Sequence, residues 1–387
     1  MTTLLDSTIR RDAQLLRFGT YLKSEYVTPT MQGLSKDIPK LLVGYEELNK
    51  LERNKLAREI RNLVKAKMSD MFDSITTEMH ELVGEESEFT FDLYDDFVES
   101  NFTPVVAATA VKIADNAILS LEKGIGRTVG LWGELTDANM LTAIKEVDAV
   151  VRDGFRGGRT LQAMMQDLRG TYNRSTKKYM GGVLNTTNAN RAETLIRTGV
   201  SHYANRARDE FANKNKSILD EGVFFATLDN RTTTICLSLH LNRYKNDDPN
   251  KPVLPLHYNE RSVYLFAGKG IDPVEGTRPI VSGQKGKEEL FDEKQSRTDK
   301  KLKINGRKNN DVFEVDIVSA KVTTKQFLDR QPRWFIESLL GKTQAKLYLD
   351  GGLPIDKFNA LGGRPLTLKE LKQTAAGEKA FRRAGID

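Results

Sequence analysis

The residues best suited to chemistry lie between positions 227 and 262. One group consists of residue types that bind Zn²⁺, with a C-x3-H pair, sixteen intervening residues and an H-x2-E pair: Cys236, His240, His257 and Glu260. Structural zinc sites favour more thiolates than the single cysteine of this chain supplies. We therefore predict no bound metal, and expect Cys236 to pack as a small hydrophobe while the two histidines hydrogen-bond to turn backbone. A Zn²⁺ site is the alternative.

The same segment is also compatible with a metal-dependent nuclease. Bases and metal ligands that would activate water beside a phosphodiester are present at four positions: His240, His257, Asn259 and Glu260. However, no motif places a general base and metal ligands together on a recognised strand–helix frame. A nuclease, or a zinc-binding nucleic-acid module, is kept as the alternative function.

Signatures of common enzyme classes are missing from the sequence. It contains no GxxxxGK followed by Ser or Thr, no GxSxG and no HExxH, so phosphate-loop NTPases, α/β-hydrolases and zincins lack their motifs. The remaining histidines, His80 and His202, fall inside predicted helices, where we expect structural roles. The sequence thus predicts a protein that is not an enzyme, with no catalytic residue and no cofactor.

Charged residues in the same segment favour a structural role. Asp229 follows a short apolar run and is suited to accept hydrogen bonds from the backbone amides after it. Arg231 and Arg261 carry planar five-donor guanidinium groups that tie separate loops to carboxylates or carbonyls. We expect two loops held together by charged and imidazole side chains.

These residues form an ordered series that resembles a known family. The series is Thr227-Leu-Asp229-x-Arg231-Thr232-x3-Cys236, then Pro255-x-His257-x2-Glu260-Arg261-Ser262, preceded by Arg197-Thr198. It is similar to the minor head proteins of tailed bacteriophages, the family named after head morphogenesis protein F of phage Mu, over roughly residues 137–266. The chain departs from the family pattern at three places: Leu254 replaces a proline, Glu260 replaces a second cysteine, and His240-Leu241 replaces Asp-Gly.

The resemblance implies a structural and assembly protein of the phage head. It implies a virion component in the capsid interior or at the portal vertex, assembled in the host bacterial cytoplasm. The implied partners are the portal protein, other head or capsid proteins and packaged double-stranded DNA, with roles in head morphogenesis and in DNA packaging or ejection. The implied structural residues are those of the motif: Arg197, Thr198, Asp229, Arg231, Thr232, Cys236, Pro255, His257, Arg261 and Ser262.

Hydrophobic periodicity predicts a predominantly α-helical α+β fold. An apolar stripe at three- and four-residue steps predicts a long amphipathic helix over 39–83, ended by Gly84 and the acidic stretch after it. Two apolar runs, 223–228 and 262–266, predict short strands. Further helices are expected at 102–121, 136–151, 160–168, 189–219, 323–340 with an interruption near Pro332, and after Pro365. Loops are expected at 124–133, 171–189 and 267–310.

These elements suggest four regions. They are an N-terminal helical region (1–135), the core module that carries the resemblance (136–266), a basic loop region rich in Gly, Lys and Asn (267–322) and a C-terminal helical module (323–387). Gln331-Pro332 and several later residues are similar to a C-terminal module of many minor head proteins.

The charge distribution suggests a nucleic-acid contact. The chain has a formal net charge of +6, and residues 294–308 hold seven basic side chains against one acid, Asp299. Such a cluster suits non-specific contact with DNA phosphates, and the candidates are Lys300, Lys301, Lys303, Arg307 and Lys308. No run of eighteen uncharged apolar residues occurs, so we expect no membrane partner.

Overall fold

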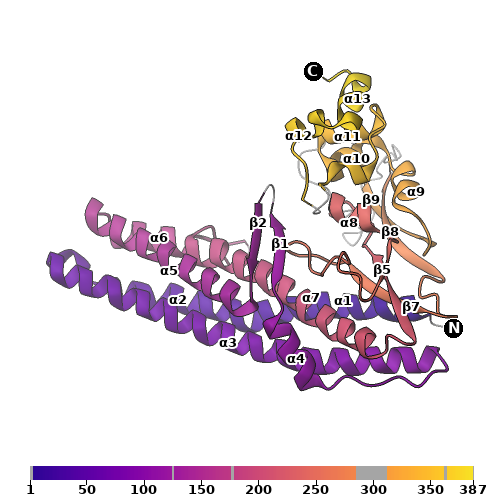
Figure 1. Ribbon diagram of the computed structural model, residues 1–387. Coiled ribbons are helices and arrows are strands. Elements are labelled where there is room, and N and C mark those ends of the chain that lie inside the picture. The colour runs from indigo at the N-terminus through magenta and orange to yellow at the C-terminus, as the bar shows by residue number, and fades with distance from the viewer. Residues whose placement is uncertain (1–2, 124–125, 176–177, 285–311, 361–363, 387) are drawn as a thin grey trace, which may run out of the picture.

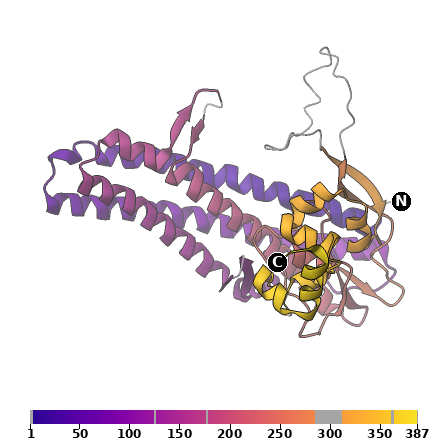
Figure 2. The ribbon, with the colours of Figure 1, turned by 90° about the horizontal axis from the view of Figure 1, so that it is seen from above.

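The computed structural model describes residues 3–386 apart from 124–125, 176–177, 285–311 and 361–363. Helices dominate and the strands form small antiparallel sheets, which confirms the predicted α+β class. The molecule consists of an elongated helical bundle with a compact β-containing part and the C-terminal helices at one end, where the N-terminus also lies (Figures 1 and 2). None of the described helices has the length and apolar composition needed to cross a membrane.

The bundle is organised around α3, the longest helix. Its helices are α1 (Leu4–Leu22), α2 (Thr28–Leu42), α3 (Lys50–Phe97), α4 (Ala107–Asn116), α5 (Trp132–Gly157), α6 (Leu161–Arg169) and α7 (Ala189–Lys214). The α3 helix packs against α2, α4, α5 and α7. Its predicted apolar stripe is buried, with Ile60, Val64 and Met68 fully inaccessible to solvent. The core around α3 includes residues on both sides of position 135, since Trp132, Val147 and Tyr203 belong to it.

The bounds predicted for the long helix, 39–83, are wrong at both ends. The chain turns at Gly44, which has a φ of +75°, and α3 starts after Asn49, whose side chain accepts hydrogen bonds from Leu51 N and Glu52 N. At the other end Gly84 does not stop the helix. The acidic stretch continues it because Glu86, fully buried, is neutralised by Arg11 and Arg208.

Two hairpins occur where the sequence predicted helix or loop. Strands β1 (Leu119–Lys123) and β2 (Gly126–Gly130) pair antiparallel, so the helix expected at 102–121 ends earlier, with α4. Leu119 and Leu121 alternate inward and are buried. Trp132, expected in a loop, begins α5. In the region 171–189, expected as loop, β3 (Thr171–Asn173) pairs with β4 (Lys178–Met180), and a π-helical segment (Val183–Asn188) leads into α7.

A three-stranded sheet carries the loops of interest. Its central strand is β5 (Leu219–Phe225), flanked by β6 (Arg243–Lys245) and β7 (Val263–Gly268), both antiparallel to it. The short helix α8 (Thr234–Leu239) lies between β5 and β6 in the chain. The two predicted strands are therefore present and adjacent. The α7 helix ends at Lys214, short of the expected Leu219, because residues from 219 onward enter β5.

The last part of the chain pairs a hairpin with small helices. Strands β8 (Thr277–Gln284) and β9 (Val312–Ser319) occupy parts of 267–322 that were expected to be loop. The helices that follow are α9 (Thr324–Asp329), α10 (Arg333–Leu340), α11 (Lys342–Leu349), α12 (Leu368–Gln373) and α13 (Ala375–Ala384). The predicted interruption near Pro332 is confirmed, since Pro332 is the N-cap of α10.

Candidate functional site

The motif residues meet where two loops approach α7. The first loop, 226–240, joins β5 to β6 and contains α8, and the second, 254–262, leads into β7. The second loop also contacts the first hairpin, because Glu122 N of β1 donates to Leu256 O at 2.7 Å. Residues far apart in the sequence are thus brought to one side of the small sheet.

Asp229 joins the two loops through Arg261. Arg261 NH1 donates to Asp229 Oδ2 at 2.5 Å and NH2 donates to Oδ1 at 2.9 Å, a bidentate pair. Asp229 also accepts from Arg231 N and from the Thr232 hydroxyl. Burial raises the pKa of Asp229, but the hydrogen bond and charge of Arg261 outweigh it and hold the pKa below its ordinary value. The carboxylate therefore stays ionised at neutral pH.

Thr198 fastens the second loop to α7. Its hydroxyl donates to Thr194 O at 2.8 Å and accepts from Asn259 N at 3.1 Å. Asn259 has a φ of +58°, and Thr198 is fully buried. The adjacent Arg197 instead pairs with Glu193 on its own helix, at 2.9 Å.

Arg231 does not play the side-chain role expected of it. It contributes its backbone N–H to the Asp229 carboxylate, while its residue is exposed to solvent. Of the two arginines predicted to tie the loops together, only Arg261 does so with its guanidinium.

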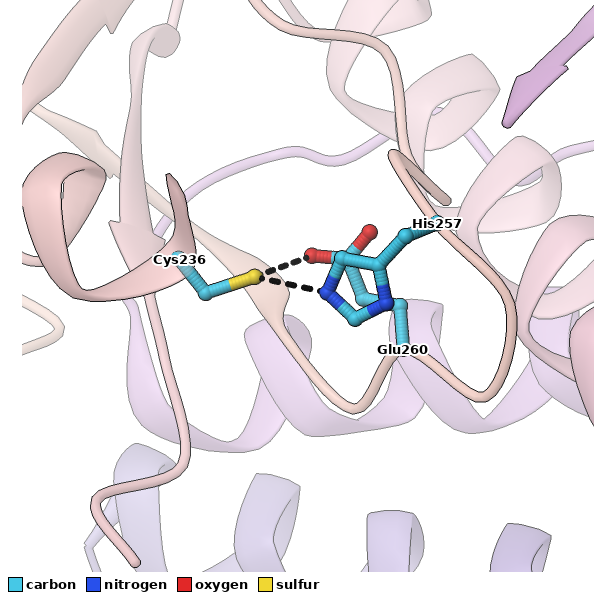
Figure 3. A group of neighbouring side chains, drawn as sticks. All are labelled: Cys236, His257 and Glu260. Carbon is cyan, nitrogen blue, oxygen red and sulfur yellow. Dashed lines mark hydrogen bonds between the residues drawn. The ribbon is translucent and has the colours of Figure 1, made fainter. Parts of the chain in front are cut away.

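Three of the four potential zinc ligands converge (Figure 3). The Cys236 sulfur lies 3.1 Å from His257 Nε2 and 3.1 Å from Glu260 Oε1. These ligand atoms all lie within 4.8 Å of one another, and Cys236 and Glu260 are buried. Burial, and then the charge of Glu260, raise the pKa of the Cys236 thiol well above its ordinary value. Cys236 packs in a buried apolar cluster, as expected of a small hydrophobe, and its sulfur also contacts two ionisable groups.

His240 lies apart from this cluster. Its Nδ1 accepts from Ala226 N at 3.2 Å, and Nε2 lies 3.2 Å from Val322 O. Burial and the charge of Arg278 lower the pKa of His240 to about 3. His240 is therefore a neutral ring that hydrogen-bonds to backbone groups, which is the role expected for it.

The remaining motif residues support the same loops. The Thr232 hydroxyl bonds to the Thr227 carbonyl, and Ser262 is buried. The peptide bond between Leu254 and Pro255 is cis. The five basic residues proposed for DNA contact, at 300, 301, 303, 307 and 308, lie outside the described residues.

Sequence reasoning missed one contributor to the cluster, Thr233. Its hydroxyl lies 3.2 Å from the Cys236 sulfur and 3.0 Å from His257 Nε2. It is the N-cap of α8 and receives a hydrogen bond from Cys236 N. The sequence contained a signal for this contact. A Thr at a helix N-cap accepts from the backbone N–H of the residue two or three positions later, and Cys236 is three positions after Thr233.

Cavities flank the cluster on two sides. One of about 230 Å³ is lined by Glu260, Arg261 and Ser262, together with residues of α1 and α7. The other, of about 880 Å³, is lined by Thr233 and His257. Glu122 Oε2 and Asn139 Oδ1, from residues that also line this second cavity, are buried acceptors without a hydrogen-bond partner among the described residues.

Comparisons with known proteins give no relative. No family model matches the chain, and no curated protein or solved structure matches it. Arguments about function therefore depend on the residues and their geometry.

Proposed function

We propose that this chain is a structural and assembly component of a tailed-bacteriophage head, a minor head protein associated with the portal. One observation carries the proposal: the separate segments of the motif contact one another through the motif's own residues. Asp229 binds Arg261, and Cys236 meets His257. The third segment joins through Thr198 and Asn259 N. A module stabilised by its own motif residues is what a structural role requires.

The chemistry of the site supports a role without catalysis. The Asp229 carboxylate is engaged by several donors, and the Cys236 thiol is buried with a raised pKa, so it makes a poor nucleophile. The long helices α3 and α5 carry many exposed residues along their length, which offer faces for docking on the portal and on other head or capsid proteins. In this proposal the protein acts in head morphogenesis and in DNA packaging or ejection, inside the virion or at the portal vertex, after assembly in the bacterial cytoplasm.

Co-purification tests the proposal. The chain is co-expressed with the portal protein encoded in the same genome, and the tagged portal rings are isolated. We expect this chain to elute with the rings and to be absent from rings of an unrelated phage. A chain that elutes alone in both cases contradicts the proposal.

A metal-dependent nuclease, or a zinc-binding nucleic-acid module, is the second candidate. The observation that favours it is the cluster of Cys236, His257 and Glu260 beside a large cavity. For the nuclease, plasmid cleavage with added Mg²⁺ or Mn²⁺ that stops in His257→Ala supports it. No cleavage by the wild-type protein excludes it under those conditions.

A further inference from the structure

The cluster of Cys236, His257 and Glu260 directs three electron-pair donors toward one point. His257 Nδ1 lies 2.9 Å from the carbonyl oxygen of Tyr258, a position that only a protonated nitrogen occupies favourably. In the neutral ring, Nε2 is then the nitrogen that carries the lone pair, and it lies 3.0 Å from the Thr233 hydroxyl. That nitrogen faces the Cys236 sulfur, and Glu260 Oε1 faces the same sulfur beside it (Figure 3).

A thiol–imidazole nucleophile does not explain this arrangement. A nucleophilic cysteine needs a lowered pKa, which comes from positive neighbours. Here a carboxylate lies 3.1 Å from the sulfur, and the pKa of the thiol is raised. Nor does Glu260 orient the imidazole, because the Tyr258 carbonyl holds Nδ1. The Cys236 thiol donates to Glu260 Oε1, so a proton lies between the sulfur and the carboxylate, in the place that a cation would take.

We propose that Cys236 Sγ, His257 Nε2 and Glu260 Oε1 together bind one Zn²⁺ ion. Thiolate, imidazole and carboxylate are the ligands that zinc takes in proteins, at about 2.0–2.3 Å. Such distances place tetrahedral ligand atoms roughly 3.5 Å apart, so the observed 3.1 Å separations need only a small outward shift. The thiolate disfavours Mg²⁺ and Ca²⁺. When the ion binds, the Cys236 thiol proton passes to solvent.

The surroundings of the three ligands suit a metal site. Outer partners hold two of them in orientation, since the Tyr258 carbonyl binds His257 and Leu256 N donates to Glu260 Oε2. His257 and Thr233 line the cavity of about 880 Å³, which leaves an entry path for the ion and room for water as a fourth ligand. The ion would join α8 to the second loop, beside the Asp229–Arg261 pair. This inference does not depend on the proposed phage function.

Metal analysis of the full-length protein tests the site. The protein is incubated with Zn²⁺, dialysed and measured by mass spectrometry, and we expect one zinc per chain. With Co²⁺ in place of zinc, we expect a near-ultraviolet band from thiolate-to-metal charge transfer. Because the band is measured on the wild-type protein, it is informative even where a variant fails to fold.

Variants test whether the retained zinc depends on the three proposed ligands and not on other histidines and acids of the chain. Cys236→Ser and Glu260→Gln are expected to lower retained zinc at least tenfold and to remove or shift the cobalt band. The matched control is His80→Gln, since His80 binds Asp115 on the bundle, and it is expected to retain zinc. A wild-type protein with no more zinc than Cys236→Ser, or without the cobalt band, overturns the proposal.

Discussion

Asp229 is the residue whose charge joins the two loops of the module. It is 8% exposed, and the side chain of Arg261 is 25% exposed. In Asp229→Asn the guanidinium of Arg261 keeps its partly buried position without a counter-charge. We expect the free energy of unfolding to fall by about 2–3 kcal/mol, below the full value for a completely buried pair because Arg261 is partly solvated. Urea denaturation measures this change.

The matched control is an exposed carboxylate in an ion pair. Asp329 pairs with Lys325 one helical turn away on α9, and both side chains are largely exposed. Asp329→Asn is expected to change stability by less than about 0.5 kcal/mol. Equal unfolding midpoints in the two variants would show that Asp229 does not hold the loops together.

Two buried histidines set the response to acid. Burial lowers the pKa of His202 to about 4, and burial with the charge of Arg278 lowers that of His240 to about 3. In the unfolded chain both rings have a pKa of about 6.5. Below that pH the unfolded state therefore binds up to two more protons on these rings than the folded state, and acid favours unfolding. Burial raises the pKa of Asp12 to about 6, although the charge of Arg208 opposes this shift. Below pH 6 the folded state therefore binds one more proton on Asp12 than the unfolded state, which favours folding.

The net effect is one proton in favour of the unfolded state. Between pH 6 and pH 5 we expect the free energy of unfolding to fall by about 1.4 kcal/mol per pH unit, and below pH 5 carboxyl groups with a lowered pKa, such as Asp229, steepen the fall. Urea titrations at several pH values measure this slope. In His240→Gln one of the two histidine protons is removed, so the slope is expected to approach zero. A wild-type protein whose stability rises on acidification would refute this assignment.

The sequence indicated most of the site residues but not their partners. The spacing of Cys236, His257 and Glu260 identified residues that do converge. His240 is also a residue type that binds metal and lies at a suitable spacing from Cys236, yet its Nδ1 accepts a hydrogen bond from the N–H of Ala226. Which lone pair is already used depends on tertiary contacts, and no spacing rule contains that information. For the same reason Arg231 and Arg261 were indistinguishable before the fold was known.

At the scale of elements, Gly199 sets how closely α7 approaches α5. A Cβ added there would lie 2.5 Å from an atom of the Trp132 ring. The ring cannot move easily, because it is buried and its Nε1 donates to Thr76 Oγ1 at 2.9 Å. Gly199→Ala is therefore expected to destabilise the protein by about 1–3 kcal/mol, despite the better helix propensity of alanine. Thermal unfolding measures the loss.

Gly33 on α2 provides the control for this substitution. A Cβ there meets nothing within 4 Å, so Gly33→Ala is expected to stabilise the protein by up to about 1 kcal/mol. The two substitutions make the same chemical change in helices and differ only in the space around them. Stabilisation by both would mean that α5 and α7 are not in close contact.

Long periodic helices were predicted better than their ends or the hairpins. The apolar stripe of α3 is visible at three- and four-residue steps. Its extension past Gly84 requires Glu86 to meet Arg11 and Arg208, which are far away in the sequence. The strands β1 and β2 are short, β2 begins and ends with glycine, and only pairing and the burial of Leu119 and Leu121 distinguish the hairpin from a loop.

At the scale of the whole molecule, buried charges join the helices of the bundle to one another, and a buried hydroxyl joins the bundle to the small sheet. Arg208 of α7 donates to Glu86 of α3 at 2.5 Å and to Asp12 of α1 at 3.0 Å. The Tyr94 hydroxyl of α3 bonds to both the N–H and the carbonyl of Phe266 in β7. The bundle and the module that carries the motif are therefore in direct contact and support each other.

Basic residues are concentrated in one segment of the chain. Variants can therefore distinguish DNA binding that depends on this segment from DNA binding that depends on the net charge. Residues 294–308 carry a local +6, equal to the net charge of the chain. A variant with glutamine at Lys300, Lys301, Lys303, Arg307 and Lys308 has a net charge of +1, since five of the +6 charges are removed. If these side chains contact phosphates, the slope of log K against log salt becomes less negative by up to about 4.5.

A second variant with the same net charge provides the comparison. It carries glutamine at five exposed basic positions of α3 or its start: Lys50, Lys55, Arg58, Lys65 and Lys67. Fluorescence anisotropy with duplex DNA over a range of salt concentrations measures both slopes. We expect the slope to flatten in the first variant and to remain close to that of the wild type in the second, because counterion release counts contacts and not distant charge. Equal affinity of wild type and first variant at low salt, or equal flattening in both variants, would remove residues 294–308 as a DNA contact.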